Sequence, residues 1–454
     1  MSLFQSLASA TSGMNAARLG LEVTGQNIAN INTRGYSRRL LSLAEARPAG
    51  ADEAGRGVEV LGIRAARDFF INARLGREGA GLAKDEAILN GVGMVEAAIG
   101  LPGESIDAKL TAFFDSFSNL AVDVTSAPAR DNVVSQAQAL AHSIGTMSRW
   151  FSTQQTDADA GVRNGVAQLN ELATRLAQLN VGITTGGPAV ETLRDERDLV
   201  LSEMSELADV ALVTRADGAI DVTVANGRAL VVGGTAYAIE VSDTPPSGYA
   251  SLSLHDANIT GAITNGRLGG LIELRDAVMP RYHAGLDQLA YDLAGQVNAL
   301  HVTGTDGDGN PGGNFFTPLT TVAGAAQALE VDPAVVANSQ LVAGSATSSA
   351  GDNQIAQAIA ALRDNEFMSG GTTPAGAWSA IVYEVGSDVS AARTASSTRE
   401  QVMRQLQQLR DQAAGVSLDE EAAALIRYQR SYEASARYFT TIVDTLDTLL
   451  SLVR

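Results

Sequence analysis

The sequence predicts a mixed, mainly α-helical fold in which long helices at the two ends of the chain pair with each other. Both terminal segments carry mostly apolar residues at alternating spacings of four and three. The sequence between them combines helical periodicity with a short strand pattern. A strict four-three spacing puts side chains on one narrow seam of a helix, as in coiled coils. Such a seam needs a partner helix, so each end of the chain is the natural partner of the other.

The N-terminal seam extends over the first 28 residues. Its positions are Leu3, Leu7, Ala10, Met14, Ala17, Leu21, Thr24 and Ile28. Ser2 and Gln5 have the spacing of a capping box, in which two side chains satisfy free backbone N–H groups at a helix start. A helix of this length would measure about 39 Å at 1.5 Å per residue. It has no apolar partner adjacent in the sequence, which favours pairing with the C-terminal segment.

The C-terminal seam follows the same rule. Its positions are Leu418, Ala422, Leu425, Gln429, Tyr432, Ala436, Phe439, Val443, Leu446, Leu450 and Val453. Ser417 and Glu420 form a second capping-box spacing, and carboxylates in the first turn favour a helix start there. We expect the polar member Gln429 to fix the register of the seam, as single polar residues do in coiled coils. The spacing alone leaves open that each stripe packs into an ordinary globular core.

Helical and strand patterns alternate between the terminal helices. Apolar residues recur at three and four over residues 87–99, 131–151 and 162–179, which predicts a helical bundle. Period-two alternation around 220–224 and 237–241, with turn pairs such as Asn226-Gly227, predicts a small β domain. The predicted domains are a terminal helical domain of residues 1–56 and 415–454, a helical domain of residues 57–206, 267–302 and 351–414, and an inserted β domain of residues 207–266, with residues 303–350 as a candidate extension.

The composition excludes several classes of protein. Lys plus Arg number 32 against 51 Asp plus Glu, a net charge of −19, so nucleic acid and anionic membrane surfaces would repel the chain. The absence of cysteine excludes disulfides, thiolate metal sites and cysteine nucleophiles. No apolar run reaches the roughly 18 residues of a membrane span, and the N-terminus lacks the pattern of a secretory signal peptide.

Candidate catalytic and metal-binding residues are scattered. The histidines are His142, His255, His283 and His301, and none has metal-ligand spacing to another. Asp306 begins a loop similar to the start of a calcium loop, but Pro311 replaces the required glycine and Thr317 the bidentate glutamate, so a turn is expected. Asp195 and Asp198 lie beside arginines, which indicates ion pairing. The sequence therefore predicts no enzymatic activity, no metal and no cofactor.

A short segment after the first helix is the most specific feature of the chain. Asn27, Asn30, Thr33, Gly35 and Tyr36 combine side chains that hydrogen-bond locally with a glycine that tolerates positive φ, which predicts a helix stop and a turn. The segment resembles the signature of the rod, hook and hook-associated proteins of the bacterial flagellum. The run from Gly415 onward is similar to the last helix of the same family, and its Leu-Asp-Glu-Glu opening at residues 418–421 favours a hook-associated member over the hook protein.

The resemblance implies a function that the residue patterns alone do not. It implies a structural subunit at the junction between hook and filament, assembled through its terminal helices into a tubular polymer. The implied partners are other copies of the chain, the flagellar hook protein, hook-associated protein 3 and an export chaperone on the C-terminal helix. It also implies export through the flagellum's own channel, without a cleaved signal peptide, to an extracellular site. Another axial protein of hook or distal-rod type, a secreted binding module and a secreted hydrolase remain as alternatives.

Overall fold

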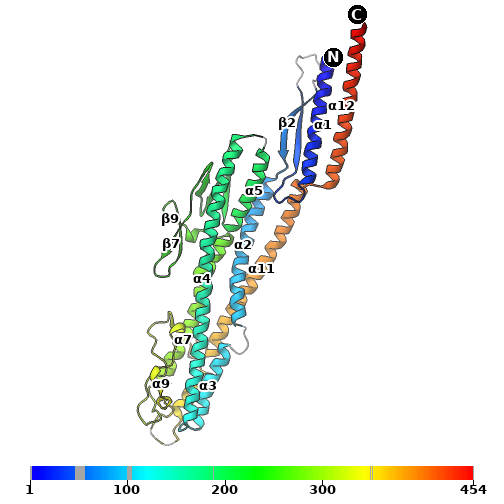
Figure 1. The fold of residues 1–454 in the computed structure, drawn as a ribbon. Helices are drawn as coiled ribbons and strands as arrows, with labels where there is room; N and C mark the ends of the chain where they lie inside the picture. Colours follow the sequence, from blue (N-terminus) through cyan, green and yellow to red (C-terminus); the bar gives the residue numbers. More distant parts are fainter. Residues whose placement is uncertain are drawn as a thin grey trace. The chain divides into compact units, whose positions relative to one another are not determined.

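The structure is a computed structural model that describes residues 3–46, 57–99, 105–187, 189–347, 349 and 351–452. It confirms a mixed, mainly helical fold with long helices at both ends and small antiparallel sheets (Figure 1). The predicted cap residue Ser2 and seam residue Val453 lie outside the described residues.

The elements follow one another in a simple order. The helices are α1 (Leu3–Ala29), α2 (Phe69–Ile99), α3 (Ile106–Val122), α4 (Ala127–Thr185), α5 (Val190–Leu207), α6 (Gly266–Glu273), α7 (Met279–His301), α8 (Ala325–Ala328), α9 (Pro333–Ala337), α10 (Gln354–Ala361), α11 (Pro374–Ala414) and α12 (Leu418–Leu452), with 3-10 turns at Thr260–Ala262 and Ser339–Leu341 and a π-helical turn at Leu274–Val278. The strands are β1 (Arg39–Glu45), β2 (Val58–Ala65), β3 (Val210–Thr214), β4 (Ile220–Val224), β5 (Arg228–Val232), β6 (Thr235–Ala236), β7 (Glu240–Thr244), β8 (Tyr249–Leu254) and β9 (Ala257–Asn258).

The chain forms two compact units whose bounds differ from the predicted domains. Unit 1 contains residues 1–80, 169–238 and 399–454, and unit 2 contains residues 81–168 and 239–398. The long helices α2, α4 and α11 contribute residues to both units, because the limits of the units after residues 80, 168 and 398 fall inside these helices, where the sequence pattern predicted no domain limit. The predicted β insert of residues 207–266 holds two separate sheets, one in each unit.

Unit 1 combines the two terminal helices, the β1–β2 hairpin, α5 and a four-stranded antiparallel sheet in the order β3-β4-β5-β6. Asn180 of α4 fastens this sheet, since its amide nitrogen donates to Ile220 O at 2.9 Å and to Gly233 O at 2.8 Å. Its amide oxygen accepts from the Ile220 N–H at 3.1 Å. One buried amide thus replaces the hydrogen bonds that a neighbouring strand would make.

Unit 2 has the larger apolar core, to which α3, α4, α7, α10 and α11 contribute buried side chains. Its centre is an aromatic cluster in which Phe113 contacts Phe117, Phe315 and Phe316. Arg275, in the π-helical turn, attaches the β7-β8-β9 sheet by donating to Ala250 O at 2.9 Å and to Asp159 at 2.5 Å. The Pro280 expected to kink or restart a helix is the second residue of α7, directly after that turn.

Residues 303–350 are the candidate extension of the β domain, and in the part of them that the structure describes there is no named strand. They form isolated β-bridges and the short helices α8 and α9, and the side chain of His301 hydrogen-bonds to their backbone. The His301 Nε2 accepts the Ala343 N–H at 2.9 Å, so Nδ1 carries the proton that it donates to Gly313 O at 2.7 Å. Burial lowers the pKa of His301 and keeps the ring neutral. The expected turn at Asp306 is confirmed, since its carboxylate accepts the N–H groups of Asp308 and Asn310.

Candidate functional site: the terminal helix pair and its anchoring turn

The terminal helices α1 and α12 lie antiparallel, side by side, within unit 1 (Figure 1). Three contacts fix their register. A Cβ atom on Gly13 would lie 2.9 Å from Ser435 Oγ, and one on Gly20 would lie 2.5 Å from the Tyr428 ring. The third contact is a hydrogen bond of 3.1 Å from Asn27 Nδ2 to Glu421 Oε2. Each seven-residue step along α1 therefore matches a seven-residue step back along α12, which is the repeat of a coiled coil.

The N-terminal seam is largely where the spacing predicts it, but its buried centre consists of small residues. The buried positions of α1 are Ala10, Ala16, Ala17, Gly20, Val23, Thr24 and Asn27. The larger predicted seam residues are half-buried at the border of this strip: Leu3, Leu7, Met14, Leu21 and Ile28. Small residues bring the two backbones close together, and glycines leave room for the side chains of α12.

The C-terminal seam is rotated by about one residue from the predicted one. The positions that meet α1 or are buried are Glu421, Tyr428, Ser435 and Ile442. Of the predicted positions, Leu425, Phe439, Val443 and Leu446 are half-buried, while Leu418, Gln429, Tyr432 and Leu450 are exposed. Within one chain the buried polar residue is Glu421, which is 2% exposed, and Gln429 does not take that place. Apolar spacing missed the rotation because three of the four contact residues are polar or amphipathic.

Asn27 joins the helix pair to the turn that follows α1. Its amide nitrogen donates to Arg39 O at 2.9 Å as well as to Glu421, and its oxygen accepts from Arg39 N and from the Tyr36 hydroxyl, both at 2.8 Å. Arg38 completes the enclosure of Glu421 with a bond of 2.7 Å from Nε to Oε1. Since Asn27 is 1% exposed, all four hydrogen bonds of its side-chain amide are shielded from water.

The remaining motif residues shape the turn. Asn30 donates from its amide to Gln26 O at 2.9 Å and accepts the Thr33 hydroxyl at 3.1 Å, which closes the end of α1. Gly35 has φ of +82°, a conformation that side chains rarely adopt, and this allows Tyr36 to return toward Asn27. Burial raises the pKa of Tyr36, so the phenol stays protonated and able to donate. The predicted stop and turn are both present.

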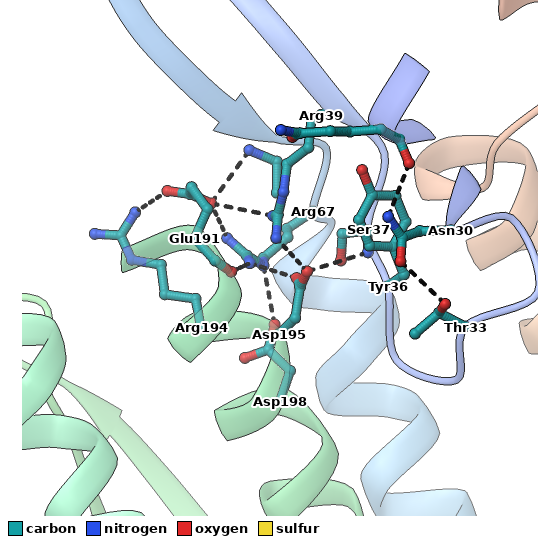
Figure 2. A network of polar contacts seen from close by, with 12 residues as sticks. Asn30, Thr33, Tyr36, Ser37, Arg39, Arg67, Glu191, Arg194, Asp195 and Asp198 are labelled. Atoms are coloured by element: carbon teal, nitrogen blue, oxygen red, sulfur yellow. Dashed lines mark hydrogen bonds and ion pairs between the residues drawn. The ribbon is translucent and has the colours of Figure 1, made fainter. Parts of the chain in front are cut away.

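A network of arginines and carboxylates binds this turn to α5 (Figure 2). Asp195 accepts Arg39 Nη2 at 2.5 Å and Arg67 Nη2 at 2.6 Å, one on each carboxylate oxygen. Glu191 accepts Arg67 Nη1 at 2.6 Å, and Arg67 Nε lies 3.0 Å from Asp198. Arg67 thus faces three carboxylates of one helix, and charge-assisted hydrogen bonds join the motif turn and the hairpin to α5.

Burial and pairing have opposite effects on these carboxyl groups. At Glu191 burial alone would raise the pKa, but the hydrogen bond and charge of Arg67 outweigh it and the pKa lies below its usual value. At Asp198 burial is the stronger effect and raises the pKa, although Arg67 and Arg197 oppose it. The arrangement suits static ion pairing, as the spacing of these acids predicts. Sequence reasoning missed Arg39 and Arg67 because their carboxylate partners lie more than 120 positions away.

The described residues contain no group of three or more histidines and acids close enough to hold a metal ion. His142 and His283 lie on different helices, and His283 Nε2 lies 3.4 Å from the Ser152 hydroxyl. We therefore expect a chelator to leave the melting temperature of the purified chain unchanged. Thermal unfolding with and without EDTA measures this. A drop of several degrees that calcium reverses would contradict it.

Comparisons with known proteins agree with this architecture. Three family models match the chain: "Flagella basal body rod protein" at residues 7–36, "Flagellar hook-associated protein FlgK helical domain" at 92–316, and "Flagellar basal body rod FlgEFG protein C-terminal" at 407–452. The first and last coincide with the two terminal helices. In the described residues no helix is long and apolar enough to cross a membrane.

Relatives from two bacteria match over nearly their whole length. "Flagellar hook-associated protein 1" of Salmonella typhimurium is 26% identical over 548 aligned positions, covering 98% of this chain and 99% of the relative. The protein of the same name from Bacillus subtilis is 26% identical, covering 99% and 98%. Because the Salmonella alignment is longer than the 454 residues of this chain, that relative has segments that this chain lacks.

A solved structure shares the fold. The "flagellar hook junction protein FlgK" of Burkholderia pseudomallei superposes with a TM-score of 0.67 at 17% identity, over 74% of this chain and 99% of that one. The family models at both ends and in the middle of the chain, together with the full-length relatives, confirm the resemblance that the motif turn indicated. The chain belongs to the flagellar hook-associated protein 1 family.

Proposed function

We propose that this chain is a structural subunit of the bacterial flagellum that forms the junction between hook and filament, and that it assembles through α1 and α12. The observation that carries the proposal is the register-matched helix pair, which is joined to the rest of unit 1 by the buried hub at Asn27. The relatives carry the name "Flagellar hook-associated protein 1", which favours a structural role in the flagellum and no enzymatic activity.

The surface of α12 supports assembly with further copies. Only Glu421 and Ile442 of this helix are buried, although it has 35 residues. Leu418, Ile426 and Leu450 remain exposed, and Leu450 is 66% exposed. An apolar helix face of this kind is typical of a surface that another protein covers. The predicted seam positions that do not face α1 are the ones we propose to contact neighbouring subunits.

The partners and the location follow from family membership rather than from contacts in this chain. We propose the hook protein on one side of the assembled ring and hook-associated protein 3 on the other, with an export chaperone on α12 before assembly. Export through the flagellum's own channel, without a cleaved signal peptide, would bring the chain to an extracellular position at the junction.

Limited proteolysis of the purified monomer tests the assembly role. We expect cleavage to trim residues before about 40 and after about 415 while sparing the core of unit 2, because α12 buries so few side chains that the terminal pair is only marginally stable alone. Cleavage sites would be located by mass spectrometry. A protease-resistant pair in a proven monomer would instead favour a self-contained binding module.

A further inference from the structure

Within unit 2, the segment between α7 and α10 is held at one buried peptide group, which joins Val342 to Ala343. Its carbonyl oxygen accepts a hydrogen bond of 3.2 Å from Arg130 Nε of α4, and its N–H donates to His301 Nε2, at the end of α7, at 2.9 Å. His301, Val342 and Ala343 are 0% exposed and Arg130 is 3% exposed. Two side chains from different helices thus hold the two sides of this peptide group, and we call the arrangement the peptide clamp.

The hydrogen bonds of the peptide clamp require a neutral histidine. A backbone N–H can only donate, so the His301 Nε2 that faces Ala343 carries no proton. A carbonyl oxygen can only accept, so Nδ1, which lies 2.7 Å from Gly313 O, carries the one proton of the ring. A protonated ring would have an N–H at both nitrogens. Nε2–H would then meet the Ala343 N–H, and two buried donors would face each other without an acceptor.

The charged groups around the ring oppose protonation on balance. Arg130 stays a cation near neutral pH, so a protonated His301 would place a second buried cation at the other side of the same peptide group. Asp306, from the loop after α7, attracts the proton, but burial outweighs it and the pKa of His301 lies below its usual value. The side chains that α3 and α10 turn toward this region, Leu120 and Ile355, do not titrate.

We propose that the peptide clamp opens in mildly acidic solution, where protonation of His301 releases the segment of residues 338–345 from α7 while the rest of unit 2 stays folded. This inference goes beyond the proposed function and does not depend on it. Opening also removes the support of a backbone hydrogen bond of 2.7 Å from Thr305 N to Ser345 O, which joins the released segment to the loop after α7. The released part is therefore local and has defined ends.

The neighbouring aromatic residues are held independently of the clamp. The Asn298 side chain accepts the N–H groups of Phe315 and Phe316, at 2.9 and 2.8 Å, and donates to Phe316 O at 2.9 Å. An amide side chain does not titrate between pH 5 and 8. The backbone around these two residues should therefore stay protected when the clamp opens, and it serves as an internal reference.

The closed clamp loses stability as the pH falls. In the open segment His301 titrates near the free value of about 6.5, and in the closed one its pKa is lower, so the open state binds more protons between the two values. Within that window the equilibrium constant for opening rises about tenfold for each pH unit, because each step adds one proton to the open state alone. We therefore expect opening to be about tenfold more favourable at pH 5.5 than at pH 7.5.

Hydrogen exchange of the purified full chain, followed by mass spectrometry, tests the proposal. Between pH 7.5 and pH 5.5 the protection factors of peptides from residues 338–345 should fall about tenfold, while peptides around Phe315 keep theirs. His301→Gln introduces a side chain that does not titrate, so this fall should disappear. His283→Gln is the matched control, since His283 is the other histidine of α7 and burial also lowers its pKa. That variant should retain the fall.

Two results would overturn the proposal: no loss of protection in the wild-type chain, or a loss of the same size in the His301→Gln chain. If the glutamine variant does not fold, the titration of the His301 ring in the wild-type chain, followed by NMR, decides. A midpoint below the free value of about 6.5 supports the proposal, and a midpoint at or above that value contradicts it.

Discussion

Asp195→Ala should destabilise unit 1 by about 3–5 kcal/mol, because it leaves two buried arginines without their shared carboxylate. Arg39 and Arg67 each donate to one oxygen of Asp195, at 2.5 and 2.6 Å, and their side chains are only 6% and 18% exposed. A loss of this size lowers the melting temperature of a body of this length by roughly 10 °C. Differential scanning calorimetry of the purified monomer measures it.

The neighbouring residue supplies a matched control. Glu196 pairs with Arg175 on the exposed side of the same helix, and both side chains are more than one-third exposed. Glu196→Ala should therefore cost at most about 1 kcal/mol. If the two variants have the same melting temperature, the ion pairs around Asp195 contribute no more to stability than an exposed ion pair does, and they do not hold the motif turn to α5.

The sequence predicts the parts of this fold that repeat locally. The four-three spacing locates both terminal helices, and the capping-box spacing at Ser417 agrees with the start of α12 at Leu418. The motif turn is readable because each residue acts within a few positions of its neighbours, as Thr33 does with Asn30. Local geometry restricts these choices strongly enough for one sequence to reveal them.

The sequence does not predict the contacts between residues that are far apart in the chain. Nothing near Glu421 indicates that its carboxylate is buried against Asn27, 394 positions away, so the spacing argument chose Gln429 as the polar seam residue. The rotation of the seam follows from Gly13 and Gly20, which accept Ser435 and Tyr428. The spacing of apolar residues does not show where a glycine leaves space for a side chain of the partner helix. The sequence therefore predicts the terminal helix pair and the motif turn, but not which residues of α1 and α12 contact each other.

Leu446→Asp should release filament from the hook while the isolated monomer melts almost as the wild-type chain does. Leu446 is half-buried near the end of α12, where few side chains are buried within one chain, so a charge there costs little before assembly. In the assembled junction we expect neighbouring helices to cover it, and an unpaired charge in a packed seam costs several kcal/mol. Filament protein in the culture medium, measured by immunoblot, reports the loss.

Asp447→Ala is the control for that variant, because it alters the next residue on the exposed side of the same helix turn. It removes a charge without placing one in a seam, so filament retention should be close to that of the wild-type chain. Unfolding curves of both monomers complete the comparison. If Leu446→Asp destabilises the monomer as strongly as a core substitution does, about 3 kcal/mol or more, then the α1–α12 pair is already fully packed within one chain. Its end would in that case be unavailable for assembly, which contradicts the role that we propose for α12.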